Sequence, residues 1–237
     1  MSKQEIEVIG ENFIRDFCPD ALQSPHPINI EEFIEFYLQL KLDYQYLSND
    51  GRYLGMTVFN NTDKVIIFDP DRNEADYLHA DARTVIIDNR LLEGNQEHRY
   101  RFTMGHEGAH DILHSGYYSY NPDQMSIFAN DDWEPMVQCR LHPLQTVPRS
   151  ANSLWSDTDW MEWQANFLSS VLLMPKPAVK VVFDAFSKRG FSSPSLLEQG
   201  VSRVFNVSPE AARYRLLSLG YIKKKESQGI SFEDLFG

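Results

Sequence analysis

The feature that most constrains this chain is an HExxH motif, His106-Glu107-Gly108-Ala109-His110, in the middle of the sequence. In a helix, His106 and His110 are four positions apart and lie on one face, where both imidazoles can bind one metal ion. Zinc suits these ligands, and a catalytic zinc keeps one position open for water. Glu107 is then expected to be the general base that takes the proton from that water and passes it to the leaving amine.

The residues around the motif favour a helix. Phe102, Ala109, Ile112 and Leu113 are apolar and recur at helical spacing. HExxH also arises by chance, so this context supports the metal-binding interpretation more than the motif alone does. His114, one further turn along, is expected to be a packing residue or a partner of a ligating histidine rather than a ligand.

A third protein ligand is needed, and Glu162 is the best candidate. The apolar residues that follow it have helical period, which predicts that Glu162 opens a second buried helix. From residue type alone, Glu162 is either that ligand or an ordinary exposed glutamate favoured by the helix dipole at a helix start. Asn166, one turn later, could hydrogen-bond a ligating histidine.

Taken together, these segments resemble the ImmA/IrrE family of metallopeptidases from bacteria and their mobile elements. The resemblance extends over about residues 30 to 222. It rests on these matches: His106-Glu107-Gly108-Ala109-His110 with Leu113-His114; Glu162-x-x-Ala165-Asn166-Phe167 running into Leu172-Leu173-Met174-Pro175; and Val207-Ser208-Pro209-Glu210-Ala211-Ala212 with Arg215-Leu216 and Leu219-Gly220.

The resemblance implies a zincin-like endopeptidase in which His106, His110 and Glu162 bind Zn²⁺ and Glu107 is the catalytic acid/base. It also implies a protein substrate, often a DNA-binding repressor or an antitoxin-like regulator, cleaved at few sites. The sequence shows no separate N-terminal DNA-binding domain, so we expect any repressor to be a second chain. The oligomeric state is left open.

Two departures from the family pattern are visible. Gly108-Ala109 replaces the more usual Leu-Gly, which weakens helix propensity slightly and changes no ligand. The stretch between His110 and Glu162 is longer than expected, which predicts an insertion at about 115–156. This insertion is rich in aromatic residues and proline. Either its aromatic residues cover the core, which we favour, or it forms a lid that supplies a Tyr or His to the oxyanion.

Composition and charge restrict the class of protein. The net charge of −12 predicts a poor binder of nucleic acid as a whole. We find no run of 18 apolar residues and no export signal, which predicts a soluble protein with no membrane partner. Cys18 and Cys139 are too few for a disulfide scaffold, and a reducing cytoplasm fits them. Cys139 could cap zinc in a latent state, but a small buried side chain is the more ordinary role.

The N-terminal part is expected to contain helices at 5–17 and 29–40, the second one with Asn29 as its N-cap and Glu32 completing a capping box. His26 lies between them and is expected to be a surface loop residue rather than a ligand. Strands are predicted at 42–47, 53–60, 64–69 and 84–88. The short turns between the first three predict antiparallel neighbours.

The C-terminal part changes in charge. Residues 176–225 carry ten Lys or Arg against three acidic residues. Two helices are predicted here, at 194–205 and 208–219, with Ser208 as N-cap and Pro209 in the first helical position. In outline this is a helix-turn-helix, which allows a DNA-binding interpretation. The family resemblance favours packing of these helices on the catalytic domain instead.

The sequence therefore predicts an α+β, zincin-like metallopeptidase with an antiparallel sheet, an HExxH helix and a second ligand helix. The expected domains are 1–175, which carries the catalytic site, and 176–237, a basic helical region. Two other functions stay open: a transcriptional regulator that binds DNA through its C-terminal helices, or a catalytically silent protein that binds a partner at its zinc site. Every catalytic residue type is present, which argues against the second.

Overall fold

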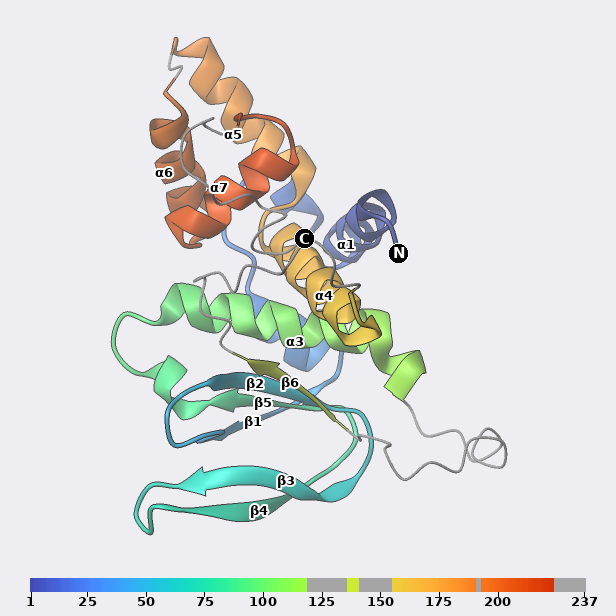
Figure 1. Ribbon diagram of the computed structural model, residues 1–237. Helices are drawn as coiled ribbons and strands as arrows, with labels where there is room; N and C mark the ends of the chain where they lie inside the picture. The colour runs from blue at the N-terminus through green and yellow to red at the C-terminus, as the bar shows by residue number, and fades with distance from the viewer. Residues whose placement is uncertain (119–135, 141–154, 191–192, 224–237) are drawn as a thin grey trace. The chain divides into compact units, whose positions relative to one another are not determined.

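The computed structural model describes residues 1–118, 155–190 and 193–223, and the backbone of 136–140 (Figure 1). The fold is α+β. The chain divides into two compact units. Ile34–His142 form the sheet unit, and Met1–Phe33 together with Pro143–Gly237 form the helical unit. The predicted domains, 1–175 and 176–237, divide the chain at a different place from these two units, and that division stays a prediction.

In its described residues, the sheet unit contains six strands, a short 3₁₀ helix and one long helix, after a π-helical turn at its start. In chain order they are β1 (Lys41–Gln45), β2 (Tyr53–Val58), β3 (Thr62–Asp69), β4 (Glu74–Ala80), β5 (Thr84–Asp88), η3 (Asn89–Leu92), α3 (Glu97–Tyr118) and β6 (Met136–Arg140).

The strands form a four-stranded sheet in the order β1-β5-β2-β6 and a separate β3-β4 hairpin. β1 pairs with β5 in parallel, whereas β2 is antiparallel to both β5 and β6. The predicted antiparallel sheet is therefore mixed. The expectation that strands 42–47, 53–60 and 64–69 are paired in sequence was wrong, because β5 lies between β1 and β2 and because β3 pairs with β4.

Burial explains why β5 takes a central place. All five of its residues are buried, and a strand covered on both faces belongs inside a sheet. The strand β4 was not predicted, since most of its residues are exposed and its sequence has no apolar run. β6 falls within the predicted insertion and adds its backbone to β2.

The sheet is covered on both faces. Met56 and Val58 of β2 join a core with residues of the β3-β4 hairpin. Gly55 and Thr57 alternate with them and face α3 instead, as side chains along a strand must. Figure 1 shows the hairpin and α3 on opposite sides of the sheet. Strand β2 therefore packs against the HExxH helix.

The described residues of the helical unit form two long helices, three C-terminal helices and two short helical segments. Its elements are α1 (Lys3–Phe17), η1 (Pro19–Leu22), α2 (Ile30–Glu32), α4 (Asp157–Leu173), α5 (Lys176–Lys188), α6 (Pro194–Phe205) and α7 (Pro209–Ser218). The helix α1 packs against α4, and α6 against α7. The predicted helices at 5–17, 194–205 and 208–219 are confirmed within one or two residues. Ser208 is the N-cap of α7, accepting a hydrogen bond from the Ala211 N–H at 3.0 Å.

Two predicted helices differ from the observed ones. The segment 29–40 begins at the Asn29 cap as expected but forms only a short α-helix, which continues as a π-helical turn, η2 (Phe33–Tyr37). Gln39 then adopts a left-handed φ of 57°, which ends the helical path. The helix α4 begins at Asp157, after a capping box between Ser156 and Asp159. Glu162 therefore lies inside this helix and does not open it.

A buried arginine ties the C-terminal helices to the rest of the helical unit. Arg215 of α7 is fully buried and forms a two-bond ion pair with Glu7 of α1. Its Nε donates to the carbonyl of Met174, just after α4, at 2.9 Å. The guanidinium also lies 5.9 Å from the centre of the Phe167 ring of α4. One side chain thus joins α1, α4 and α7.

Among the described residues, no helix is long and apolar enough to cross a bilayer.

Candidate metal centre

The middle of α3 places titratable side chains where a structural helix would have apolar ones. His106, Glu107 and His110 are fully buried, and α3 lies against β2 and β5. Burying a polar group is costly unless it is hydrogen-bonded or bound to a metal. The sequence HExxH thus forms a helix, as predicted, and its polar residues point into the protein.

The two motif histidines converge. Nε2 of His106 and Nε2 of His110 lie 3.0 Å apart, and the ring centres are 4.7 Å apart. Two nitrogens on one tetrahedral zinc, each at about 2.0–2.1 Å, are separated by about 3.3 Å. The observed separation is close to that value. The same nitrogen on each ring therefore faces a common point, which is the arrangement that a shared metal ion requires.

His114 contacts the opposite side of the His110 ring. The two Nδ1 atoms lie 3.0 Å apart, and His114 is also buried. Only one nitrogen of such a pair can donate. If His110 uses Nε2 for a metal, its Nδ1 carries the proton and donates to His114. His114 thus lies where it can fix the tautomer of His110, the kind of role that the sequence predicts for it.

Glu107 is held by the strand beneath it. The hydroxyl of Thr57 on β2 donates to Oε2 of Glu107 at 2.6 Å, and the Glu107 carbonyl is 3.0 Å from the same hydroxyl. Gly55, two residues earlier, makes room for the carboxylate, because a Cβ at that position would lie 2.5 Å from Oε1. Strand β2 therefore sets the position of both carboxylate oxygens.

The glycine at position 108 has a steric reason. A Cβ on Gly108 would overlap Cδ1 of Ile34, which is itself fully buried. Glycine lowers helix propensity by about 1 kcal/mol relative to alanine. Here it lets the π-helical turn that contains Ile34 approach α3 closely.

Arg83 anchors the helix next to the motif. This residue precedes β5 and donates to Asp111 of α3 at 3.2 Å and to the carbonyl of Leu38 at 2.7 Å. Burial raises the pKa of the Asp111 carboxyl above its ordinary value, and Arg83 partly offsets that rise. The contact joins α3 to the segment that leads into β1.

Glu162 and Asn166 come from the helical unit. Both lie on α4, one turn apart, and both are half-buried. His106 and His110 belong to the sheet unit and Glu162 to the helical unit, so a metal site shared by the three residues stays a prediction. Two imidazoles and one carboxylate are a donor set that suits zinc and leaves one position open. The chemistry of the candidate ligands therefore fits the metal that the sequence predicts.

Parts of the predicted insertion at 115–156 lie outside the described residues. These include Tyr120, Trp133 and His142, so the covering and lid interpretations both stay predictions. The side chain of Cys139 is likewise outside the described residues. Residues 115–118 belong to α3, and 136–140 pair with β2. The insertion thus begins as an extension of the HExxH helix and contributes a strand to the sheet.

Sequence analysis missed Thr57 and Gly55, the two residues that place Glu107. Threonine is common in strands, and a glycine in a strand carries no specific signal. The one available sign was alternation: both residues lie on the same face of the predicted strand 53–60. Nothing in the sequence shows that this face meets the HExxH helix.

A scan against protein-family models and a search of curated proteins found no match for this chain.

Proposed function

We propose that this protein is a zinc-dependent endopeptidase of the ImmA/IrrE type that cleaves a protein substrate. One observation carries the proposal. The Nε2 atoms of His106 and His110 face each other at 3.0 Å in a buried site, next to a glutamate that a buried hydroxyl holds in place. A structural helix has no need of this costly arrangement.

Three residues would hold the metal: His106 and His110 through Nε2, and Glu162 through its carboxylate. Zinc bound there would supply a Lewis acid and lower the pKa of a water molecule to near neutrality. With the metal on Nε2 of His110, the Nδ1–H of His110 would donate a hydrogen bond to Nδ1 of His114. Asn166 is proposed as a further hydrogen-bonding partner in this ligand shell.

Glu107 is proposed to move the protons. Its carboxylate accepts a proton from the attacking water and then delivers it to the leaving amine. Thr57 donates to Oε2, so that oxygen is occupied and oriented. Oε1 lies on the side that Gly55 leaves open. Burial strengthens these interactions, because a low dielectric screens them less than water does.

The proposed substrate is a regulator such as a repressor, present as a separate chain. This part of the proposal comes from the family resemblance. An extended peptide can add to the edge of a sheet through backbone hydrogen bonds. In the described part of the sheet, β6 is the strand next to β2, which carries Thr57. We propose that the substrate strand adds on this side of the sheet.

The DNA-binding alternative loses one of its expected contacts. Arg215 is one of the ten basic residues of 176–225, but it is fully buried in its pair with Glu7. A phosphate cannot reach it without disrupting the helical unit. Arg213 is half-exposed and remains on the surface. The C-terminal helices are thus part of the packed unit, which favours the peptidase proposal.

Elemental analysis of the purified protein tests the ligand set. We expect His110→Ala and Glu162→Ala each to contain about one zinc per chain fewer than the parent. Glu107→Gln should retain zinc, because that residue is not a ligand. Gln164→Ala is a matched control on the same helix as Glu162. An equal decrease in Gln164→Ala, or the full zinc content of the parent in both ligand variants, would contradict the proposal.

Mapping of protein N-termini in the native cell tests the activity. Cells that express the parent should contain new N-termini that cells expressing Glu107→Gln lack. A silent partner-binding protein would produce the same N-termini in both strains. A regulator acting on DNA would change transcript levels in both strains without new N-termini.

A further inference from the structure

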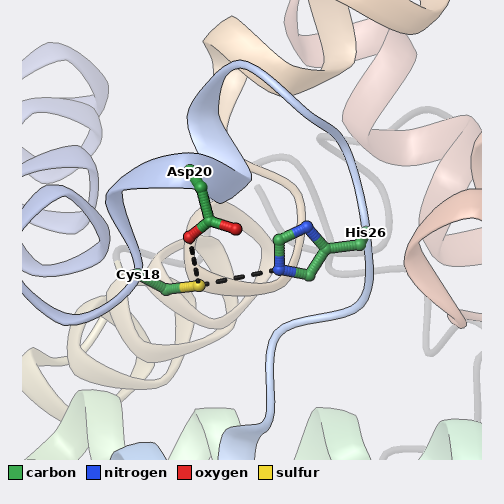
Figure 2. Close-up of side chains that lie close together, drawn as sticks. All are labelled: Cys18, Asp20 and His26. Atoms are coloured by element: carbon green, nitrogen blue, oxygen red, sulfur yellow. Dashed lines mark hydrogen bonds between the residues drawn. The ribbon is translucent and has the colours of Figure 1, made fainter.

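A second cluster of metal-ligating side chains lies in the helical unit, at the end of α1. Figure 2 shows the side chains of Cys18, Asp20 and His26 pointing toward one another. Sγ of Cys18 is 3.4 Å from Oδ1 of Asp20 and 3.6 Å from Nε2 of His26. Cys18 and His26 are half-buried, whereas Asp20 is exposed. His26 lies in the loop after η1, as the sequence predicts, and whether it is a ligand is not decided by that position.

The tautomer of His26 is fixed by the backbone. Nδ1 lies 2.7 Å from the carbonyl oxygen of Ser24, which can only accept, so Nδ1 carries the proton. In the neutral ring, Nε2 then presents a lone pair to the Cys18 sulfur. A backbone carbonyl that orients a histidine in this way is the usual support of a metal-ligating imidazole.

The three side chains of this cluster cannot all be satisfied by hydrogen bonds to one another. Nε2 of His26 and Oδ1 of Asp20 are both acceptors, and both face Cys18, whose thiol has one proton to donate. Burial and the Asp20 carboxylate raise the pKa of the Cys18 thiol above its ordinary value. A cation in the middle satisfies all three groups at once.

The distances fit a tetrahedral zinc ion. With Zn–S of about 2.3 Å and Zn–N of about 2.1 Å, a tetrahedral angle separates sulfur and nitrogen by about 3.6 Å. The same calculation with a carboxylate oxygen gives about 3.6 Å. The observed separations from Sγ are 3.6 Å to Nε2 and 3.4 Å to Oδ1. The ligating atoms of all three residues lie within 4.8 Å of one another.

We propose that Cys18, Asp20 and His26 form an accessory zinc site, distinct in its ligands from the His106–His110 centre. The fourth position is left to water, since Asp20 keeps the cluster open to solvent. All three ligands come from the nine residues 18–26, which contain η1 and the loop after it. The element η1 packs against α1 and α5. Bound zinc would thus act as a clip that fixes the chain where it leaves α1.

Cobalt(II) alone is the probe for this site. Cobalt replaces zinc in tetrahedral sites, and thiolate ligation gives a charge-transfer band in the near ultraviolet that histidine and carboxylate ligands do not. The full chain is prepared as Cys139→Ser, which leaves Cys18 as the only cysteine. We expect the band to appear on cobalt addition and to rise to a plateau.

Variants in the same background assign the ligands. Adding Cys18→Ser should abolish the band, and His26→Gln should weaken cobalt binding at least about tenfold. No band in the folded Cys139→Ser protein, or a band that His26→Gln leaves unchanged, would overturn the proposal. The His106–His110 centre contains no thiolate, so a negative result here leaves the proposed peptidase function untouched.

One measurement needs no change at the cluster. Zinc bound to Cys18 should slow the reaction of that thiol with a disulfide reagent in the Cys139→Ser protein, and a chelator should restore the rate. An unchanged rate with saturating zinc would contradict the site even if Cys18→Ser or His26→Gln failed to fold.

Discussion

The hydroxyl of Thr57 on β2 donates to the carboxylate of Glu107 on α3 over 2.6 Å, and both side chains are fully buried. Fifty positions separate the two residues in the chain. The contact connects strand β2 with Glu107, the residue that is proposed to act as the general base. The orientation of that group is therefore set by the sheet and not by the helix alone.

Thr57→Val should impair catalysis without loss of metal. Valine has the shape of threonine but no hydroxyl, so Glu107 loses a charge-assisted hydrogen bond of about 1.5–3 kcal/mol. We expect cleavage of the substrate identified by N-terminal mapping to slow about tenfold to a hundredfold. Zinc content should stay at the parent level.

Thr57→Ser is the matched control, because it retains the hydroxyl and removes only a methyl group. It should keep most of the activity. If Thr57→Ser and Thr57→Val are equally slow, packing rather than the hydrogen bond accounts for the effect.

Gly55→Ala should displace the Glu107 carboxylate directly. The added methyl would lie 2.5 Å from Oε1 of Glu107 and 2.8 Å from Cγ2 of Thr103. Overpacking of this kind costs about 1–3 kcal/mol, and the carboxylate must move to relieve it. We expect a lower kcat with retained zinc, measured on the same substrate. A protein with full activity would show that the strand moves away freely and that Gly55 does not position Glu107.

Arg215→Ala should destabilise the helical unit strongly. Removing one partner of a buried ion pair leaves Glu7 uncompensated, which costs about 3–5 kcal/mol. Arg213→Ala is the matched control on the same helix, because Arg213 is half-exposed and 4.0 Å from Glu198, and an exposed pair contributes about 0–1 kcal/mol. Chemical denaturation followed by the helical circular dichroism signal gives both values. An equal decrease in the free energy of unfolding of both variants would show that the buried ion pair contributes no more stability than the Arg213–Glu198 pair.

His79 on the hairpin should titrate above its ordinary range. Hydrogen bonds to Asp63 at 2.5 Å and to Asp81 at 3.4 Å raise the pKa of the imidazole. The folded hairpin therefore prefers the protonated ring. The stabilisation is complete below the ordinary histidine pKa of 6.5 and disappears as the pH rises through the raised value.

A histidine-selective NMR titration measures this pKa. Asp63→Asn should lower it toward the ordinary value, since Asp63 is the stronger partner. Glu74→Gln changes a hairpin carboxylate that pairs with Arg72 and should leave it unchanged. If both variants shift the His79 pKa equally, general charge and not the direct hydrogen bond is the cause.

The sequence determined the local structure well where the signals are local. His106 and His110 share a helix face because helical periodicity places residues four apart together. Ser208 caps α7 because its side chain reaches an N–H three residues away. The strand 84–88 was recognisable from its own β-branched residues. Each of these features depends on neighbours within one or two turns of chain.

Only the tertiary structure decided the contacts between distant segments. The pairing of β1 with β5 in parallel depends on which strands are buried on both faces, and short turns between strands gave the opposite expectation. Arg215 seemed available to DNA by composition, but it pairs with Glu7 across 208 positions of sequence. Thr57 and Gly55 place Glu107 because β2 lies beneath α3. Such contacts depend on packing between elements, and neither residue type nor periodicity specifies which elements meet.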